Sequence, residues 1–266
     1  MMNIIKVDDI KNPDIQIFTS LNEKQVKKIY EPDLGLFICE SEKVISRALD
    51  AGYEAEVFFV DEERLDAVSR LIGDDSNVPV YTAPAEIMKN LTGYALTGGV
   101  LAAMKRKALE SVDDVLKRCR NIVVLDDVEN PTNIGAIFRS AAALGADCVL
   151  LTAGCADPLY RRAARVSMGT VFQVDWTYAG ADVIAKLKDN GFQTMALALS
   201  DDSIDLGSVP INGYERKAVV MGNEDHGISK EILEECDSVI KIPMKAGVDS
   251  LNVAAASAVA FWEAFK

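Results

Sequence analysis

Three separated stretches of this sequence carry polar residues from which a catalytic or binding site could be built. The first, NPTNIGAIFR (130–139), places Asn133, Gly135 and Arg139 at the start of a predicted helix. Helical side chains lean toward the helix N-terminus, so we expect Arg139 to lean over Gly135, where no side chain blocks it. Because glycine costs about 1 kcal/mol in a helix relative to alanine, this spacing indicates room for a ligand or a partner chain. For Asn133 alone we favour a structural role, since asparagine is a preferred helix N-cap.

The second stretch, MGNEDHGIS (221–229), is a predicted strand end and loop. Gly222 ends the strand and Glu224 lies in the loop, where its carboxylate either orients a polar partner or simply faces solvent. Ser229 is placed to start the next helix. His226 is the only histidine of the chain, which invites a general-base role. We favour the plainer interpretation that His226 is a bystander in a polar turn.

The third stretch, IPMKAGVDSLNVA (242–254), leads into a closing helix at 251–265. Ser250 or Asp249 is expected to cap this helix, and Asn252 lies in its first turn. An asparagine amide offers both a donor and an acceptor, and it is costly to bury without partners. The helix is apolar nearly all round and rich in alanine, which predicts that it is buried and closely approached by another element, from this chain or from a second subunit.

Alternating strands and helices must position these three stretches. In the N-terminal part we predict strands at 34–40, 55–60, 80–82 and 98–105, with helices near 22–30, 41–51 and 62–72. In the C-terminal part we predict strands at 121–128, 147–153, 170–176, 192–199, 217–222 and 238–244, with helices over 134–145 and 251–265. Near-continuous apolar strands separated by helices indicate a parallel sheet covered on both faces, so the predicted fold class is α/β.

A charged stretch at 105–121 separates the two parts, and we place a domain boundary there, giving domains 1–112 and 113–266. The same stretch also suits a surface helix within one domain. All three polar stretches lie at strand ends, where ligands gather in α/β sheets. The glycine-rich nucleotide fingerprints are absent. Composition and spacing therefore predict an α/β protein with a polar site assembled from three strand ends.

The composition narrows the classes of function. The net charge of −13 weighs against non-specific nucleic-acid binding. Three local basic clusters, at 105–107, 117–120 and 161–165, leave a positive patch open as an alternative to solvated surface charge. No apolar run is long enough for a transmembrane helix and no signal peptide is expected. The five cysteines form no C-x-x-C pair, so we expect neither a disulfide framework nor a zinc site, and a cytoplasmic location.

In this order and spacing, the three stretches resemble the motifs of the SpoU (TrmH-like) family of RNA 2′-O-ribose methyltransferases, within the SPOUT superfamily. The residues that carry the resemblance are Asn133, Gly135, Arg139, Gly222, Glu224, Ser250, Leu251 and Asn252. RVSMGTVFQV (165–174) is similar to a connecting segment of that family. More loosely, 35–63 and 98–107 resemble a small substrate-binding domain similar to an RNA-binding ribosomal protein fold. One departure is Asp225, which stands where the family has the second glycine of G-x-E-G-x-G and adds negative charge.

The resemblance implies a catalytic domain at 113–266 whose parallel sheet contains a trefoil knot, preceded by a smaller α/β RNA-binding domain at 1–112. It implies a homodimer with the site near the subunit interface, and no metal. S-adenosylmethionine would be the cofactor, held by Gly222, Ile242 and Leu251. The implied reaction is methyl transfer to a ribose 2′-hydroxyl of structured RNA, with ribosomal RNA preferred over transfer RNA.

The resemblance also implies roles for the polar residues. In the family, the arginine matching Arg139 is assigned to activating the hydroxyl. Because arginine is always protonated, we instead expect Arg139 to hold the adjacent phosphate and to favour the alkoxide electrostatically, with the proton acceptor unassigned. Asn133, Glu224, Ser250 and Asn252 would orient RNA and hold the loops. The alternatives are a transfer-RNA methyltransferase, a non-catalytic RNA-binding member, and a small-molecule α/β enzyme that shares only the knot.

Overall fold

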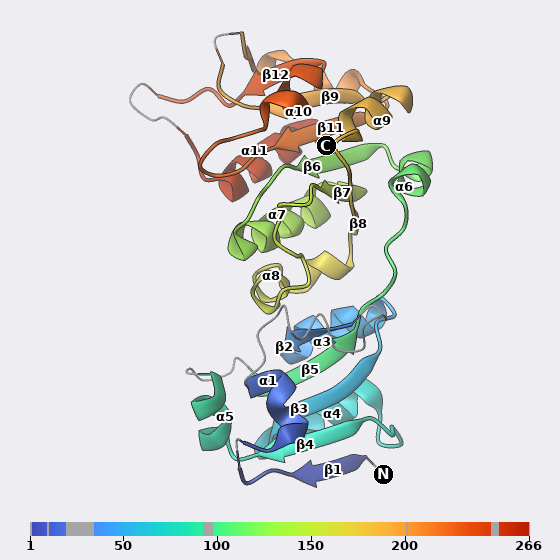
Figure 1. The fold of residues 1–266 in the computed structure, drawn as a ribbon, viewed down its shortest axis with the longest axis vertical. Helices are drawn as coiled ribbons and strands as arrows, with labels where there is room; N and C mark the ends of the chain where they lie inside the picture. Colours follow the sequence, from blue (N-terminus) through green and yellow to red (C-terminus); the bar gives the residue numbers. More distant parts are fainter. Residues whose placement is uncertain are drawn as a thin grey trace. The chain divides into compact units, whose positions relative to one another are not determined.

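The computed structural model describes residues 2–9, 11–19, 35–92, 98–200, 202–245 and 250–265. The chain divides into two compact units, the first made of Met1–Ala108 with Leu159–Phe172 and the second of Leu109–Pro158 with Gln173–Lys266 (Figure 1). Residues 159–172, which the sequence places after its boundary, therefore cluster with the first unit. The helix expected near 22–30 lies outside the described residues. No helix in the described part of the chain is long and apolar enough to cross a membrane.

The first unit is built on a mixed five-stranded sheet in the order β1-β4-β3-β5-β2. Its strands are β1 (Asn3–Lys6), β2 (Leu36–Glu40), β3 (Ala55–Asp61), β4 (Pro79–Ala83) and β5 (Val100–Lys105). Strands β1, β4 and β3 are parallel, whereas β5 is antiparallel to both β3 and β2. Its α-helices are α1 (Gln16–Thr19), α3 (Glu42–Asp50), α4 (Leu65–Ile72), α5 (Ala85–Thr92) and α8 (Arg161–Val166), with short 3-10 helices η1 (Pro13–Ile15), η2 (Glu62–Arg64) and η3 (Thr170–Phe172).

The second unit is built on a seven-stranded sheet in the order β10-β12-β9-β11-β6-β7-β8. Its strands are β6 (Asn121–Leu125), β7 (Cys148–Leu151), β8 (Asp175–Tyr178), β9 (Gln193–Leu197), β10 (Ile204–Asp205), β11 (Lys217–Met221) and β12 (Ser238–Lys241). Every neighbouring pair is parallel, so the predicted parallel sheet is confirmed. The expected strand at 170–176 is wrong in position, because Met168 and Gly169 turn the chain with positive φ and η3 follows before β8 begins.

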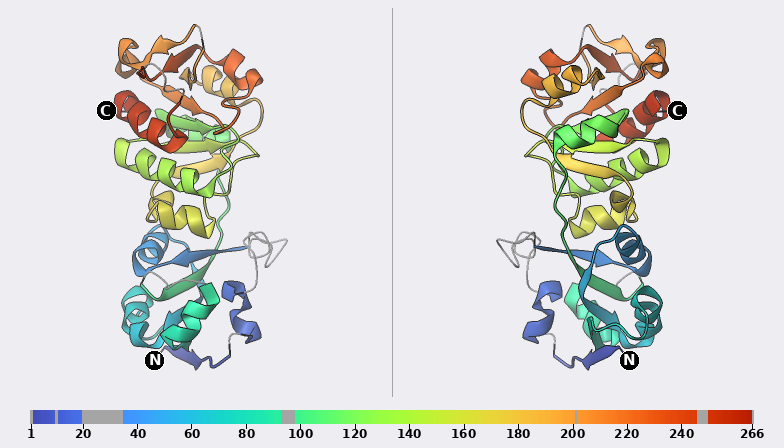
Figure 2. Two further views of the ribbon diagram at one scale, coloured as in Figure 1. Left: turned by 90° about the vertical axis from the view of Figure 1, so that its left-hand side faces the viewer. Right: turned by 90° about the vertical axis from the view of Figure 1, so that its right-hand side faces the viewer.

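Helices cover both faces of this sheet because its strands are apolar on both sides. Side chains of α6 (Val112–Arg118), α9 (Val183–Asp189) and α10 (Lys230–Glu235) form one core cluster with alternate residues of the strands, such as Ile122 and Val124 of β6. The intervening residues, such as Val123 and Leu125, are equally buried on the other face. There α7 (Pro131–Leu144) lies beside α11 (Val253–Phe265) (Figure 2). Two short 3-10 helices, η4 (Leu206–Ser208) and η5 (Ile211–Gly213), complete the unit.

Candidate active site

The first motif opens α7 one turn earlier than the sequence predicts. The side chain of Asn130 caps the helix by accepting a hydrogen bond from the Thr132 amide at 2.8 Å, and Pro131 occupies the first helical turn. Proline suits that position because it has no N–H and its φ is already helical. The expectation that Asn133 caps the helix is therefore wrong. As the third helical residue, Asn133 leaves its side chain free for another partner.

Asn133 connects all three motifs. Its amide nitrogen donates to the carboxylate of Glu224, and its amide oxygen accepts from the amide of Asn252 at 3.3 Å. Asn133 is 8% exposed, so both of its polar atoms are satisfied where water has little access. The two partners lie 91 and 119 residues further along the chain. The convergence of the three stretches at one place is thus observed as a chain of hydrogen bonds.

Asn252 has a second role at the start of α11. Its side-chain oxygen accepts from the Ala254 amide at 2.9 Å, which is the bond of a helix N-cap. Capping by Ser250 was the expectation, and it is wrong, because Ser250 stands two residues too early to reach the first free amides. Asp249, the other expected cap, lies outside the described residues. One amide therefore both caps the closing helix and holds it to α7.

The loop of the second motif is folded tightly back on the end of β11. Asn223 and Gly227 exchange backbone hydrogen bonds of 2.9 and 3.0 Å, and Gly227 has a φ of 73°. A Cβ at Gly222 would overlap the backbone of Gly227 and Ile228. Glycine at 222 is therefore required by the close approach of the two segments.

Asn223 is a site residue that the sequence reasoning missed. Its side chain donates to the carbonyl of Asp127 at 2.7 Å and accepts from the Asp225 amide at 2.8 Å. It therefore ties the loop of the second motif to the loop that precedes α7. An amide placed directly after a strand-ending glycine is the only signal in the sequence that points to it.

Two acids after β6 support the same loops. Asp126 is buried and accepts from the Ser229 amide at 2.7 Å. Ser229 begins α10 as predicted, although its own side chain makes no capping bond. Asp127 has a φ of 53°, and its carboxylate accepts from the Thr152 hydroxyl at 2.8 Å. Both carboxylates therefore have hydrogen-bond partners within the second unit and stabilise these loops.

A cavity of about 610 Å³ opens beside these loops, within the size range of small-molecule sites. Six of the eight predicted site residues line it: Gly222, Glu224, Ile242, Ser250, Leu251 and Asn252. Apolar side chains, including Leu197, Met221 and Val253, form much of the rest of its wall. Asp225 and His226 also line the cavity.

Asn133 and Arg139 do not line this cavity. Asn133 reaches its rim through Glu224 and Asn252. The side chain of Arg139 projects from α7 into solvent and makes no hydrogen bond or ion pair with any residue that the structure describes. Gly135 is buried, so the open approach beside it that the sequence indicates is not observed in the single chain. The guanidinium of Arg139 is available to a ligand or partner outside the chain.

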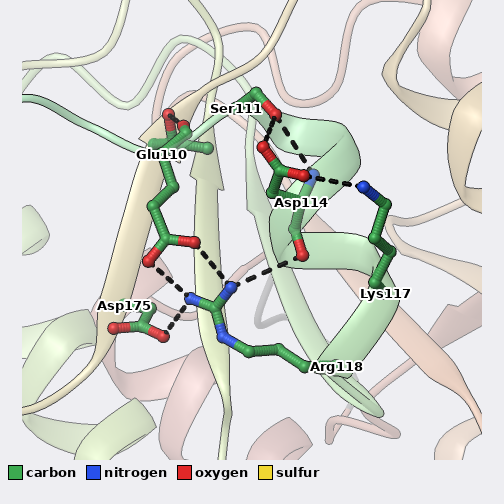
Figure 3. Close-up of polar contacts among 7 residues, drawn as sticks. Glu110, Ser111, Asp114, Lys117, Arg118 and Asp175 are labelled. Atoms are coloured by element: carbon green, nitrogen blue, oxygen red, sulfur yellow. Dashed lines mark hydrogen bonds and ion pairs between the residues drawn. The ribbon is translucent and has the colours of Figure 1, made fainter.

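The three basic clusters differ from Arg139 because acidic groups pair with many of their charges. Lys117 bonds to Asp114 at 2.7 Å, and Arg118 contacts Glu110 at 2.6 Å and Asp175 at 2.7 Å (Figure 3). The hydrogen bonds to Asp175 and Glu110 raise the pKa of Arg118. In the first unit, Lys105 pairs with Glu54 and Glu56, and both Arg161 and Arg165 pair with the buried Glu40. The clusters are therefore largely neutralised within each unit.

Residues 120–262 match the SpoU rRNA Methylase family. An uncharacterized tRNA/rRNA methyltransferase from Mycobacterium tuberculosis is 36% identical over 267 residues, which cover 97% of this chain and 92% of that protein. The 23S rRNA (guanosine-2′-O-)-methyltransferase RlmB of Acinetobacter baylyi is 28% identical over 214 residues, covering 77% of this chain and 84% of that protein.

Solved structures show the same fold. The AdoMet-bound rRNA methyltransferase from Sinorhizobium meliloti has a TM-score of 0.85 at 24% identity, covering 98% of this chain and 97% of that one. The SpoU methyltransferase AviRb from Streptomyces viridochromogenes, in complex with AdoMet, has a TM-score of 0.79 at 21% identity, covering 96% and 98%. The membership predicted from three short motifs is confirmed by the family match and the 36% identical relative: this chain belongs to the SpoU rRNA Methylase family.

Proposed function

We propose that this protein transfers a methyl group from S-adenosylmethionine to a ribose 2′-hydroxyl of RNA, and that its substrate is ribosomal rather than transfer RNA. The observation that carries the proposal is the pair of side-chain hydrogen bonds that link Asn133 to Glu224 and to Asn252. These bonds hold the three family motifs together at the rim of one cavity. The choice of a ribose in ribosomal RNA follows the name of the Acinetobacter baylyi relative.

The cavity suits S-adenosylmethionine in size and in chemistry. Apolar side chains such as Leu197, Met221 and Ile242 offer a surface for a flat purine, while the loop at Gly222 brings backbone groups close to the ligand. We assign Gly222, Ile242 and Leu251 to binding the cofactor. When bound, the cofactor supplies an electrophilic methyl group on a sulfonium sulfur.

No group of three or more acidic, histidine or cysteine side chains suited to a metal occurs among the described residues.

The polar residues act by positioning and by charge. Asn133, Glu224 and Asn252 hold the loops in one arrangement, and Ser250 at the exposed rim orients the RNA. Alignment of a nucleophile with its target lowers the activation barrier by roughly 7–11 kcal/mol in favourable cases. Arg139 holds the phosphate next to the reacting ribose and stabilises the developing alkoxide electrostatically. The base that accepts the hydroxyl proton is not assigned.

The proposed assembly is a homodimer in which α11 faces the partner. Residues Ala255, Val259 and Trp262 lie on one side of this helix, since they are spaced by four and three positions. Val259 is 44% exposed and Trp262 is 61% exposed, an apolar stripe that a monomer would leave in water. Dimerisation would also bring a second chain near Arg139, because α7 and α11 lie side by side.

We also propose the roles of the two domains, a knot in the chain and the location of the protein. The domain at 1–112 binds the RNA substrate, and the domain at 113–266 carries the catalytic site. The C-terminal segment forms a trefoil knot. A cytoplasmic location follows from the proposed substrate.

A non-catalytic member and a transfer-RNA methyltransferase are the two alternatives to this proposal. A non-catalytic RNA-binding member has no need for a cavity lined by Glu224, Ser250 and Asn252. A transfer-RNA methyltransferase would use the same chemistry, and only the substrate separates it from our proposal.

Transfer of a tritiated methyl group from S-adenosylmethionine into RNA tests the proposal. RNA should come from a strain that lacks this protein, so that the target position is unmodified. We expect label in ribosomal RNA, recovered after alkaline hydrolysis as a dinucleotide, because a 2′-O-methyl group blocks cleavage at that position. Label in an alkali-sensitive mononucleotide would exclude ribose as the acceptor. Label only in transfer RNA would exclude the ribosomal substrate.

A further inference from the structure

Asp225 is the point where this chain departs from the G-x-E-G-x-G pattern, and its backbone shows that glycine is not needed there. Among the described residues with positive φ, the loop contributes Gly227 and not Asp225. The Asp225 amide donates to the side chain of Asn223 at 2.8 Å, which fixes the turn. An aspartate therefore fits this position without backbone strain, and its backbone is held in the turn.

The carboxylate of Asp225 is free to act on a ligand. It lines the 610 Å³ cavity and makes no hydrogen bond or ion pair within the described part of the chain. The neighbouring Glu224 differs, because its carboxylate is already bonded to Asn133.

The described cavity lining contains too little positive charge to balance these acids. Lys241 is the one lysine or arginine among those lining residues, and it lies 4.0 Å from the carboxylate of Asp205. Glu224 and Asp225 thus leave the cavity with excess negative charge. A negative field in a cleft favours cationic ligands over neutral ones of the same shape.

We infer that Asp225 is a specificity residue that makes this cavity prefer S-adenosylmethionine over the product S-adenosylhomocysteine. The inference rests on the proposed function. The two molecules differ by one methyl group and by the positive charge of the sulfonium. A carboxylate in the cavity wall therefore attracts the sulfonium of S-adenosylmethionine, which S-adenosylhomocysteine lacks. For an exposed charge pair the preference amounts to about two- to fivefold in affinity. This preference would help the enzyme to release its product when both molecules are present.

Calorimetric titration of the full-length protein tests this inference with three probes. They are S-adenosylmethionine, S-adenosylhomocysteine and sinefungin, in which an amine keeps the positive charge near the sulfonium position. Asp225→Asn removes the charge and keeps the shape, whereas Asp225→Glu keeps the charge. Glu231→Gln, on α10 and outside the described cavity lining, is the matched control.

We expect Asp225→Asn to lower the affinity for S-adenosylmethionine and sinefungin by about two- to fivefold and to leave the affinity for S-adenosylhomocysteine unchanged. Asp225→Glu and Glu231→Gln should keep the wild-type ratio. Raising the salt from about 0.05 M to about 0.5 M should reduce the preference of the wild type and not that of Asp225→Asn, because salt screens exposed charges.

Other outcomes would overturn the inference. Equal weakening of all three probes by Asp225→Asn would show that the residue only supports the loop. An Asp225→Asn protein that kept the wild-type ratio of affinities for S-adenosylmethionine and S-adenosylhomocysteine would show that Asp225 does not discriminate between them. If the wild type bound none of the probes, the proposed function would fail together with the inference, whereas binding without discrimination would leave the proposed function intact.

Discussion

The side-chain amide of Asn133 in α7 donates a hydrogen bond to the carboxylate of Glu224 in the loop after β11, 91 residues further along the chain. The same amide accepts from Asn252 at the start of α11. Asn133 is therefore the junction of the site, whereas Asn130, three residues earlier, is only a helix cap.

Replacing these two asparagines should separate helix stability from site geometry. Asn130→Ala removes an N-cap and should lower the free energy of unfolding by about 1 kcal/mol while methyl transfer at saturating substrate stays near wild type. Asn133→Ala removes the bonds to two loops and should lower kcat by more than about tenfold, a barrier change of about 1.4 kcal/mol. Urea unfolding and methyl-transfer kinetics measure the two quantities. If both variants lose the same fraction of activity, the junction role of Asn133 is wrong.

Arg139→Ala should abolish methyl transfer and leave the fold intact. The guanidinium has no partner among the described residues, so its loss should change the free energy of unfolding by less than about 0.5 kcal/mol. The affinity for S-adenosylmethionine should also stay unchanged, because Arg139 does not line the cavity. Arg120→Ala, which removes another exposed arginine, 3.8 Å from Glu215, is the control and should remain active. Wild-type activity in Arg139→Ala would remove this residue from the mechanism.

Gly222→Ala should disrupt the cavity. The added Cβ overlaps the backbone of Gly227 and Ile228, so the loop must move and S-adenosylmethionine binding should be lost. Overpacking of this kind costs about 1–3 kcal/mol of stability. Gly207→Ala is the matched control, since a Cβ there meets nothing within 4 Å. Thermal unfolding and calorimetric titration report the two effects, and a Gly222→Ala protein with normal cofactor affinity would contradict the close approach.

Acid should destabilise the second unit partly through Asp237. Burial opposes ionisation of Asp237, yet hydrogen bonds from Thr194 and Lys188 outweigh it and hold the pKa of Asp237 below its ordinary value. The carboxylate of Asp237 is therefore protonated at a lower pH in the folded protein than in the unfolded chain, where the pKa of an aspartate is about 3.9. The resulting stability is complete above that pH and is lost as the pH falls through the folded pKa.

Asp237→Asn tests this linkage. The variant should be less stable than the wild type at neutral pH, and the difference should shrink as the pH falls below about 4. Both tryptophans, Trp176 and Trp262, belong to the second unit, so their fluorescence in urea follows this unit. Glu234→Gln, in an exposed pair with Lys230 on α10, should have little effect at any pH. A difference that stays constant with pH would assign the effect to packing.

Val259→Asp should produce a monomer. A carboxylate in the centre of an apolar interface is desolvated without a partner, which is strongly unfavourable. Because Val259 is half-exposed in the single chain, the fold itself should survive. Light scattering after size-exclusion chromatography measures the mass, and Val259→Ala should remain dimeric. A monomeric wild type, or a dimeric Val259→Asp, would contradict the proposed interface.

The elements of the second unit could be predicted well because burial leaves a local signal. Strands β6 and β11 are buried along nearly their whole length, so they stand out as short apolar runs. The apolar side of α7 was equally visible, since Ile134, Phe138 and Ala141 recur at helical spacing and are buried. Positions 170–176 misled the prediction, because an apolar segment with β-branched residues also fits a short 3-10 helix at a turn.

The order and spacing of the three motifs already indicated which polar residues this protein brings to its strand ends, and these motifs were sufficient to identify the family. The role of each residue became clear only in the folded protein: Asn130 and not Asn133 caps α7, Asn252 and not Ser250 caps α11, and Asn223 ties two loops together. The apolar pattern of a strand is local, whereas the residue that caps a helix depends on where packing against the rest of the fold makes that helix begin. A side-chain bond between residues about a hundred positions apart forms only after the sheet has set where both loops lie.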